Sequence, residues 1–164
     1  MISNRLFFNG IRIFIDYTKF ELDSTQFTKV VSSKQIIKDK LSKAARLMEQ
    51  IVMLPRYTEN IAITDELKSK ILSSVPQYDD TLTKGVSYDL IVFPEIVSAK
   101  NTRLDGELKV VSFNSYPLVL DPKLKRPMMG KIEIFDVDYS KMDNQETYFL
   151  NAFIHQLMHI LVFD

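Results

Sequence analysis

The last part of the chain contains an almost entirely apolar run, FLNAFIHQLMHIL, at residues 149–161. Within it only Asn151, His155, Gln156 and His159 are polar. A helix this rich in apolar side chains is buried on most of its sides, so other layers of structure must pack around it. The run therefore predicts a helix that begins near Asn144 and lies inside a layered domain.

Upstream, the chain alternates between strand-like and helix-like segments. Residues 34–54 carry apolar side chains three and four positions apart, which predicts a long amphipathic helix that Pro55 ends. Asp143 and Glu146 predict a capping box at the start of the last helix. β-branched and aromatic residues predict strands at residues 11–15, 88–93, 107–113 and 130–137, the second of them ended by Pro94.

Between these elements the sequence predicts loops at residues 16–33, 76–85 and 114–128, a turn at residues 101–106 and a short helical turn near residues 64–72. The order of the elements is strand, long helix, three strands and a final helix. This order predicts an α+β fold, with a twisted mixed sheet of about four strands and helices packed on one face.

Length and composition indicate the number of domains, the partners that are not expected and the location of the protein. The chain has 164 residues, which fits one domain, and its 21 basic and 21 acidic residues give a formal net charge of zero. A neutral chain without a basic block is not expected to bind nucleic acid. The sequence has no cysteine, no secretory signal and no apolar run long enough for a membrane span, so we expect an intracellular protein.

The spacing of His155 and His159 places both imidazoles on one face of the last helix, one turn apart. Two imidazoles at this spacing can bind one zinc ion, and they are the only histidines in the chain. The signature of a catalytic zinc helix has a glutamate after the first histidine, whereas this chain has Gln156. Spacing alone therefore leaves two interpretations open: a metal site, or two core histidines bonded to other polar groups.

Two stretches together resemble the leishmanolysin-like family of zinc metallopeptidases. The first is RPMMGKIEI, residues 126–134, which is similar to the family pattern Arg-Pro-x-x-Gly-x-Ile-x-Ile. The second is HQLMHILVF, residues 155–163, which is similar to the zinc-helix pattern His-Glu-x-x-His-x-Leu-Gly-Phe. Weaker similarity extends to IRIFIDY at residues 11–17 and to the strands YDLIVF and VVSF.

The resemblance implies a zincin-like fold over residues 1–164, as a single leishmanolysin-like N-terminal subdomain that lacks the C-terminal part of the family fold. It implies a twisted sheet, a long backing helix and an active-site helix on which His155 and His159 are zinc ligands. In such enzymes zinc activates a water molecule, the glutamate between the histidines takes its proton, and an edge strand pairs with an extended peptide.

The chain departs from this pattern at four points. Gln156 stands at the position of the general base, whose loss costs on the order of 10²- to 10⁴-fold in rate. The family's third histidine comes from beyond the helix, and this chain has no other histidine. Val162 replaces the glycine that lets the family's chain turn out of the helix. The absence of cysteine differs from a family that is usually secreted and cystine-rich.

These departures favour a catalytically inactive, leishmanolysin-like scaffold that binds other protein chains in a larger assembly. The subdomain alone would expose an apolar side of its last helix, which a neighbouring chain could cover. Two alternatives stay open. One is a zinc-dependent metalloendopeptidase whose missing parts lie elsewhere. The other is an unrelated α+β binding domain, which would be favoured if residues 126–134 did not lie beside the last helix as a strand.

Overall fold

The computed structural model describes residues 8–55, 65, 87–99, 101–104, 107–110, 112–121 and 124–161. The predicted elements at residues 64–72 and 76–85 therefore lie almost wholly outside the described residues. The described helices are α1 (Thr18–Asp23), a 3-10 helix η1 (Val30–Ser33), α2 (Lys34–Ile51) and α5 (Gln145–Ile160). The described strands are β1 (Phe8–Gly10), β2 (Ile13–Ile15), β3 (Met53–Pro55), β4 (Leu90–Val97), β5 (Asn101–Leu104), β6 (Glu107–Val110), β7 (Phe113–Leu120) and β8 (Pro127–Phe135).

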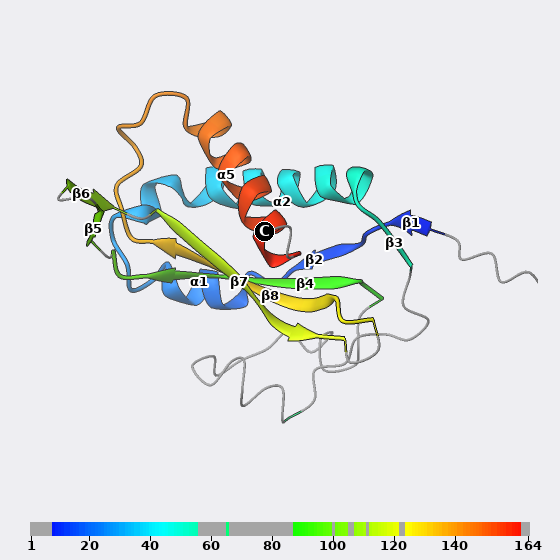
Figure 1. Ribbon diagram of the computed structural model, residues 1–164. Coiled ribbons are helices and arrows are strands. Elements are labelled where there is room, and N and C mark those ends of the chain that lie inside the picture. Colours follow the sequence, from blue (N-terminus) through cyan, green and yellow to red (C-terminus); the bar gives the residue numbers. More distant parts are fainter. Residues whose placement is uncertain are drawn as a thin grey trace, which may run out of the picture.

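The main sheet has four strands in the order β2-β4-β8-β7 (Figure 1). β2, β4 and β8 run parallel to one another, and β7 runs antiparallel to β8 at one edge. The prediction of a mixed sheet of about four strands in an α+β domain is therefore confirmed. Residues 90–93 in β4 are buried on both faces of the sheet, which explains why this strand is continuously apolar.

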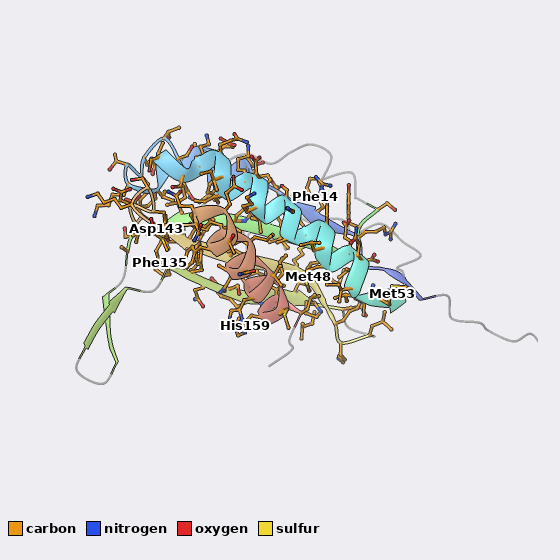
Figure 2. The ribbon with its side chains drawn as sticks, turned by 90° about the horizontal axis from the view of Figure 1, so that it is seen from above. Phe14, Met48, Met53, Phe135, Asp143 and His159 are labelled. Atoms are coloured by element: carbon orange, nitrogen blue, oxygen red, sulfur yellow. The ribbon has the colours of Figure 1, made fainter. Side chains whose placement is uncertain are left out.

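Helices α2 and α5 lie side by side over the same face of the sheet (Figures 1 and 2). The main core fills the space between this face and the two helices. Fully buried side chains reach it from every layer: Leu41 from α2, Val92 from β4, Ile132 from β8 and Phe153 from α5. The apolar face predicted for residues 34–54 is therefore the face that meets the sheet. Helix α5 is buried on one side only, so the prediction that it is buried on most of its sides is wrong.

The segment predicted as a loop at residues 16–33 is partly helical, so that prediction is wrong. The carboxylate of Asp16 accepts a hydrogen bond from the backbone N–H of Thr18 at the start of α1. Near the end of the same helix, the carboxylate of Asp23 accepts one from the backbone N–H of Ile96 at 2.9 Å. Helix α1 therefore provides a hydrogen-bond partner for the edge of β4 beyond the point where β2 ends.

Strand β4 continues through Pro94, so the prediction that this proline ends the strand is also wrong. The carbonyl of Val92 accepts a hydrogen bond from Asp16 on the side of β4 that faces β2. In an extended strand the nitrogen of Pro94 faces that same side, past the last paired residue of β2, Ile15. A proline fits there because no ladder hydrogen bond is required from its nitrogen.

Residues 101–128 differ most from the prediction. Strands β5 and β6 form a separate antiparallel hairpin, so residues 107–110 do not join the main sheet. The fourth strand of the sheet is instead β7, which lies almost wholly in the segment predicted as a loop at residues 114–128 and contains Pro117. This proline lies in an edge strand beside an irregularity in the register, and edge strands tolerate both features.

The ends of the two long helices also differ in detail. Helix α2 ends at Ile51, and Pro55 lies in β3 after an extended Val52, so Pro55 does not end the helix directly. Helix α5 begins after Asn144, which is left-handed with φ 55°, and no side chain caps it. The predicted capping box of Asp143 and Glu146 is therefore wrong, and the Glu146 carboxylate binds Lys40 on α2 at 3.0 Å.

Gly130 of β8 allows α5 to approach the sheet closely. A Cβ atom at this position would overlap the Cγ2 atom of Ile160, on the last turn of α5. Ile160 is fully buried and its β-branched side chain has little rotational freedom, so it cannot move away easily. The glycine of the RPMMGKIEI motif thus fixes the distance between the strand and the helix that carries the histidines.

We expect Gly130→Ala to lower the free energy of unfolding by about 1–3 kcal/mol, the usual cost of overpacking a core. Urea denaturation measures this change, and the double variant Gly130→Ala, Ile160→Ala provides the matched comparison. Because the second substitution removes the overlapping atoms, adding the Gly130→Ala change to Ile160→Ala should cost less than it does in the wild-type chain. Equal costs in the two backgrounds would contradict the close contact.

Candidate functional site

Helix α5 presents two opposite faces. Its buried face consists of Phe149, Phe153, Leu157 and Ile160, which have no exposed surface and point toward the sheet. Their spacing of three and four residues is that of one side of a helix. On the other side His155 is exposed and His159 is partly buried, so the prediction of one shared face for the histidines is confirmed.

The two histidine rings converge at their Nε2 atoms, which lie 2.8 Å apart. The ring centroids are 4.4 Å apart and the ring planes meet at 86°. At this distance one Nε2–H donates a hydrogen bond to the other Nε2. Two nitrogen ligands at roughly 2.0–2.1 Å from a tetrahedral zinc ion lie about 3.3 Å apart, so a small opening of the pair would admit the ion. The residues fit two ligands of a zinc site.

Gln156 points away from the histidines and is nearly buried, with 9% of its surface exposed. Its side-chain Oε1 accepts a hydrogen bond from the hydroxyl of Ser115 on β7, at 2.7 Å, and its backbone oxygen lies 3.0 Å from the same hydroxyl. Gln156 therefore ties α5 to the edge strand. A neutral amide has no useful basicity near neutral pH, so this side chain cannot take a proton from water.

Ser115 is part of the site although the sequence alone does not indicate it. It lies within the segment predicted as a loop, and a single serine there carries no recognisable signal. In the structure it faces α5 from β7, opposite Ile132 of β8. Among the described strands, β7 pairs only with β8, so Ser115 lies on an edge strand directly beside the helix that bears the histidines.

The described residues do not complete a metal site. Within the part of the chain that the structure describes, no group of three or more His, Cys, Asp or Glu side chains comes together to hold a metal ion. A catalytic zinc site normally uses three protein ligands and a structural site four. His155 and His159 therefore account for half of a closed, four-ligand site.

Tyrosine hydroxyls are also candidates in such a site, but these lie elsewhere. Tyr139 is buried, and its hydroxyl donates to the backbone carbonyls of Phe135 and Ser112. Tyr116 is on the opposite face of the sheet, where its hydroxyl lies 3.4 Å from the carboxylate of Glu133. Burial raises the pKa of the Tyr116 hydroxyl above its ordinary value. Neither hydroxyl is placed to assist chemistry at the histidines.

An apolar groove of about 550 Å³ runs beside α5, between its last turns and the end of α2. Figure 2 shows Met48 and Met53 along one side of this region and His159 on the other. Several groove side chains are unusually exposed for apolar residues: Ile51 by 71%, Met53 by 52% and Met158 by 41%. The residues that line the groove are Met48, Ile51, Val52, Met53, Leu54, Ile154 and Met158.

No described helix is both long enough and apolar enough to cross a membrane. Comparison with known proteins adds no assignment, because neither a protein-family model nor a curated protein matches the sequence. The described residues thus combine a convergent histidine pair, a hydrogen-bonded amide at Gln156, an edge strand and an apolar groove.

Proposed function

We propose that this chain is a zincin-like domain that binds other protein chains and does not cleave them. The arrangement of the fold supports the zincin-like assignment. The family resemblance implies three parts that this fold has. They are a sheet with one antiparallel edge strand, a long backing helix, α2, and a histidine-bearing helix, α5, beside that edge. β8, which carries most of the RPMMGKIEI motif, is a strand packed against α5 through Gly130 and Ile160. This position argues against the unrelated binding domain.

The observation that carries the proposal is the position of Gln156. When bound, zinc would polarise a carbonyl group and make a bound water more acidic, and His155 and His159 are the residues to hold it. The chain's own contribution to hydrolysis would be a base that removes the proton. In this chain that position is an amide whose oxygen is bonded to Ser115. The hydrogen bond between these two residues holds α5 against the edge strand, and the amide at this position cannot accept the proton.

A binding role remains compatible with every other feature of the site. An extended segment of another protein can add to the free edge of a sheet through backbone hydrogen bonds. The exposed side chains of Ile51, Met53 and Met158 provide apolar surface next to α5. Exposed apolar surface of this kind is typical of protein-binding sites.

The proposal predicts that the purified chain, supplied with zinc, produces no new peptide termini from an unfolded protein substrate. Mass spectrometry of the digest detects such termini directly. The His155→Ala, His159→Ala double variant is the control, because it removes every histidine in the chain. Cleavage by the wild-type chain that is lost both in this variant and in the presence of a chelator would contradict the proposal.

The second candidate is a zinc-dependent metalloendopeptidase whose missing parts lie elsewhere. One observation favours it: the Nε2 atoms of His155 and His159 converge at 2.8 Å beside an edge strand. This candidate requires another group to replace the missing base. It therefore predicts zinc-dependent cleavage, which is the result that the first proposal excludes.

A further inference from the structure

A small cavity lies between β2 and α2, at the opposite edge of the sheet from β7 (Figure 1). Its volume is about 180 Å³, well below the roughly 300–1,000 Å³ of pockets that hold drug-sized ligands. A ligand of this cavity must therefore be a molecule of only a few heavy atoms. The rings of Phe14 and Tyr88, with centroids 5.1 Å apart, provide an apolar part of the lining. The polar part comes from Ile13 and Ile15 of β2, through their backbone, and from Ser42, Arg46 and Glu49 of α2.

Helix α2 contributes one stripe of side chains to this cavity, at Ser42, Ala45, Arg46 and Glu49. From Ser42 these positions follow at intervals of three and four, which is the spacing of one face of a helix. Ala45 is buried and small, so it leaves room where a longer side chain would fill the space. Arg46 and Glu49 are neighbours on the helix surface, with Cβ atoms about 5–6 Å apart. The cavity therefore has one positive and one negative group on the same side.

Strand β2 adds backbone groups from its outer edge. The carbonyl of Arg12 and the N–H of Asp16 form hydrogen bonds to β4. Because backbone groups alternate in direction along a strand, those of Ile13 and Ile15 point away from β4. The N–H of Ile13 donates to a carboxylate oxygen of Glu49 at 2.9 Å, so this edge of β2 faces α2. The C=O of Ile13 and the N–H of Ile15 therefore give the cavity one acceptor and one donor.

Hydrogen bonds within the chain hold two of the polar side chains on α2 in place. Glu49 uses one carboxylate oxygen for the N–H of Ile13, and its second oxygen can accept a hydrogen bond from a ligand. The hydroxyl of Ser42 lies 2.8 Å from that of Tyr17, which donates to the carbonyl of Lys38 at 3.0 Å. Polar groups that are already fixed lose less conformational entropy when a ligand binds. The cavity is thus prepared for a small polar ligand.

We propose that this cavity binds a free α-amino acid in its zwitterionic form. The carboxylate of the ligand binds the guanidinium of Arg46 and the N–H of Ile15, and its ammonium group binds the carboxylate of Glu49 and the C=O of Ile13. Both contacts with charged side chains are charge-assisted hydrogen bonds, which are the strong ones. A ligand with a single charge would leave either Arg46 or Glu49 without a charged partner. This site goes beyond the proposed function, because it serves a small molecule at the other edge of the sheet.

Nuclear magnetic resonance of the full chain labelled with ¹⁵N tests this site, with glycine and L-alanine as the probes. The expected result is a saturable shift of the backbone amide signal of Ile15. Two analogues of glycine each lack one charge: glycinamide has no carboxylate, and N-acetylglycine has no ammonium group. Each should bind about tenfold or more weakly than glycine, because each loses one set of charge-assisted hydrogen bonds.

Two variants remove the charges of the cavity one at a time. Glu49→Gln keeps an acceptor for the N–H of Ile13, so it should weaken the binding of glycine and leave that of N-acetylglycine unchanged. Arg46→Gln should weaken the binding of glycine and N-acetylglycine and leave that of glycinamide unchanged. Lys43→Gln is the matched control, because it removes an exposed positive charge from the same helix at a residue that does not line the cavity. It should leave the binding of all three ligands unchanged.

Three outcomes would overturn the amino-acid site. The first is no saturable shift at Ile15 with either glycine or L-alanine. The second is equal affinity of the wild-type chain for glycine, glycinamide and N-acetylglycine, a comparison that requires no variant to fold. The third is a loss of glycine binding in Lys43→Gln as large as that in Arg46→Gln. None of these measurements involves the histidine helix, so the cleavage assay of the proposed function has an independent outcome.

Discussion

Replacing Phe149 with alanine is expected to lower the free energy of unfolding by about 3–5 kcal/mol, the usual cost of truncating a large buried aromatic side chain. Phe149 has no exposed surface and lies at the centre of an aromatic cluster. Its ring centroid is 5.2 Å from that of Tyr139, 5.9 Å from that of Phe153 and 6.1 Å from that of Phe113. The cluster joins α5 to β7, so its loss would also loosen the histidine helix.

Urea denaturation followed by circular dichroism measures this effect, and Phe149→Leu is the matched control. Leucine keeps most of the apolar volume, so its cost should stay below about 2 kcal/mol. A cost below about 1 kcal/mol for Phe149→Ala would contradict a position at the centre of the core. We also expect Phe149→Ala to weaken zinc binding at His155 and His159, because both histidines lie on the helix that this ring anchors.

Replacing Asp89 with alanine is the second large change, with an expected loss of about 3 kcal/mol. Asp89 is 1% exposed and lies next to two arginines. One oxygen of its carboxylate accepts hydrogen bonds from the backbone N–H and the Nε–H of Arg12, at 3.0 and 3.1 Å, and the other oxygen lies 3.4 Å from the guanidinium of Arg126. Truncating the acid removes the buried negative charge that lies between the two guanidinium groups.

Two variants separate this effect from the loss of any ion pair. Asp89→Asn keeps an acceptor for the backbone of Arg12 but removes the charge, so its cost should be smaller than that of Asp89→Ala. Glu146→Ala removes the exposed pair with Lys40 and should change stability by less than about 0.5 kcal/mol. Equal losses for Asp89→Ala and Glu146→Ala in urea denaturation would contradict the buried position of Asp89.

The sequence predicts those helices and strands whose residues follow a local pattern along the chain. Helix α2 follows from the spacing of its apolar residues, because burial on one face imposes a period, and α5 follows from its apolar run. Strands β2, β4 and β8 follow from their β-branched and aromatic residues. The shared face of His155 and His159 follows from the same geometry. The four-stranded mixed sheet could be predicted because a strand, a long helix and further strands have few ways to pack together.

The remaining features depend on contacts between distant segments. The hydrogen bond between Asp23 and Ile96 joins residues that are 73 positions apart in the sequence, and the one between Asp89 and Arg12 joins residues that are 77 apart. No local pattern therefore predicts either contact.

The sequence predicts a loop at residues 114–128, which carry Pro117, Pro122 and Pro127, because proline is a poor strand residue in general. The place of β7 at the edge of the sheet, which makes Pro117 acceptable, is a property of the whole fold. The position of Ser115 beside α5 likewise depends on the whole fold, because a single serine carries no local signal.

The most direct test of a domain that binds protein chains without cleaving them is the appearance of new peptide termini in an unfolded protein incubated with the zinc-supplied chain. We expect none from the wild-type chain, because the side chain of Gln156 is an amide and cannot take a proton from water. New termini that disappear in the His155→Ala, His159→Ala variant and in the presence of a chelator would contradict a role in binding alone.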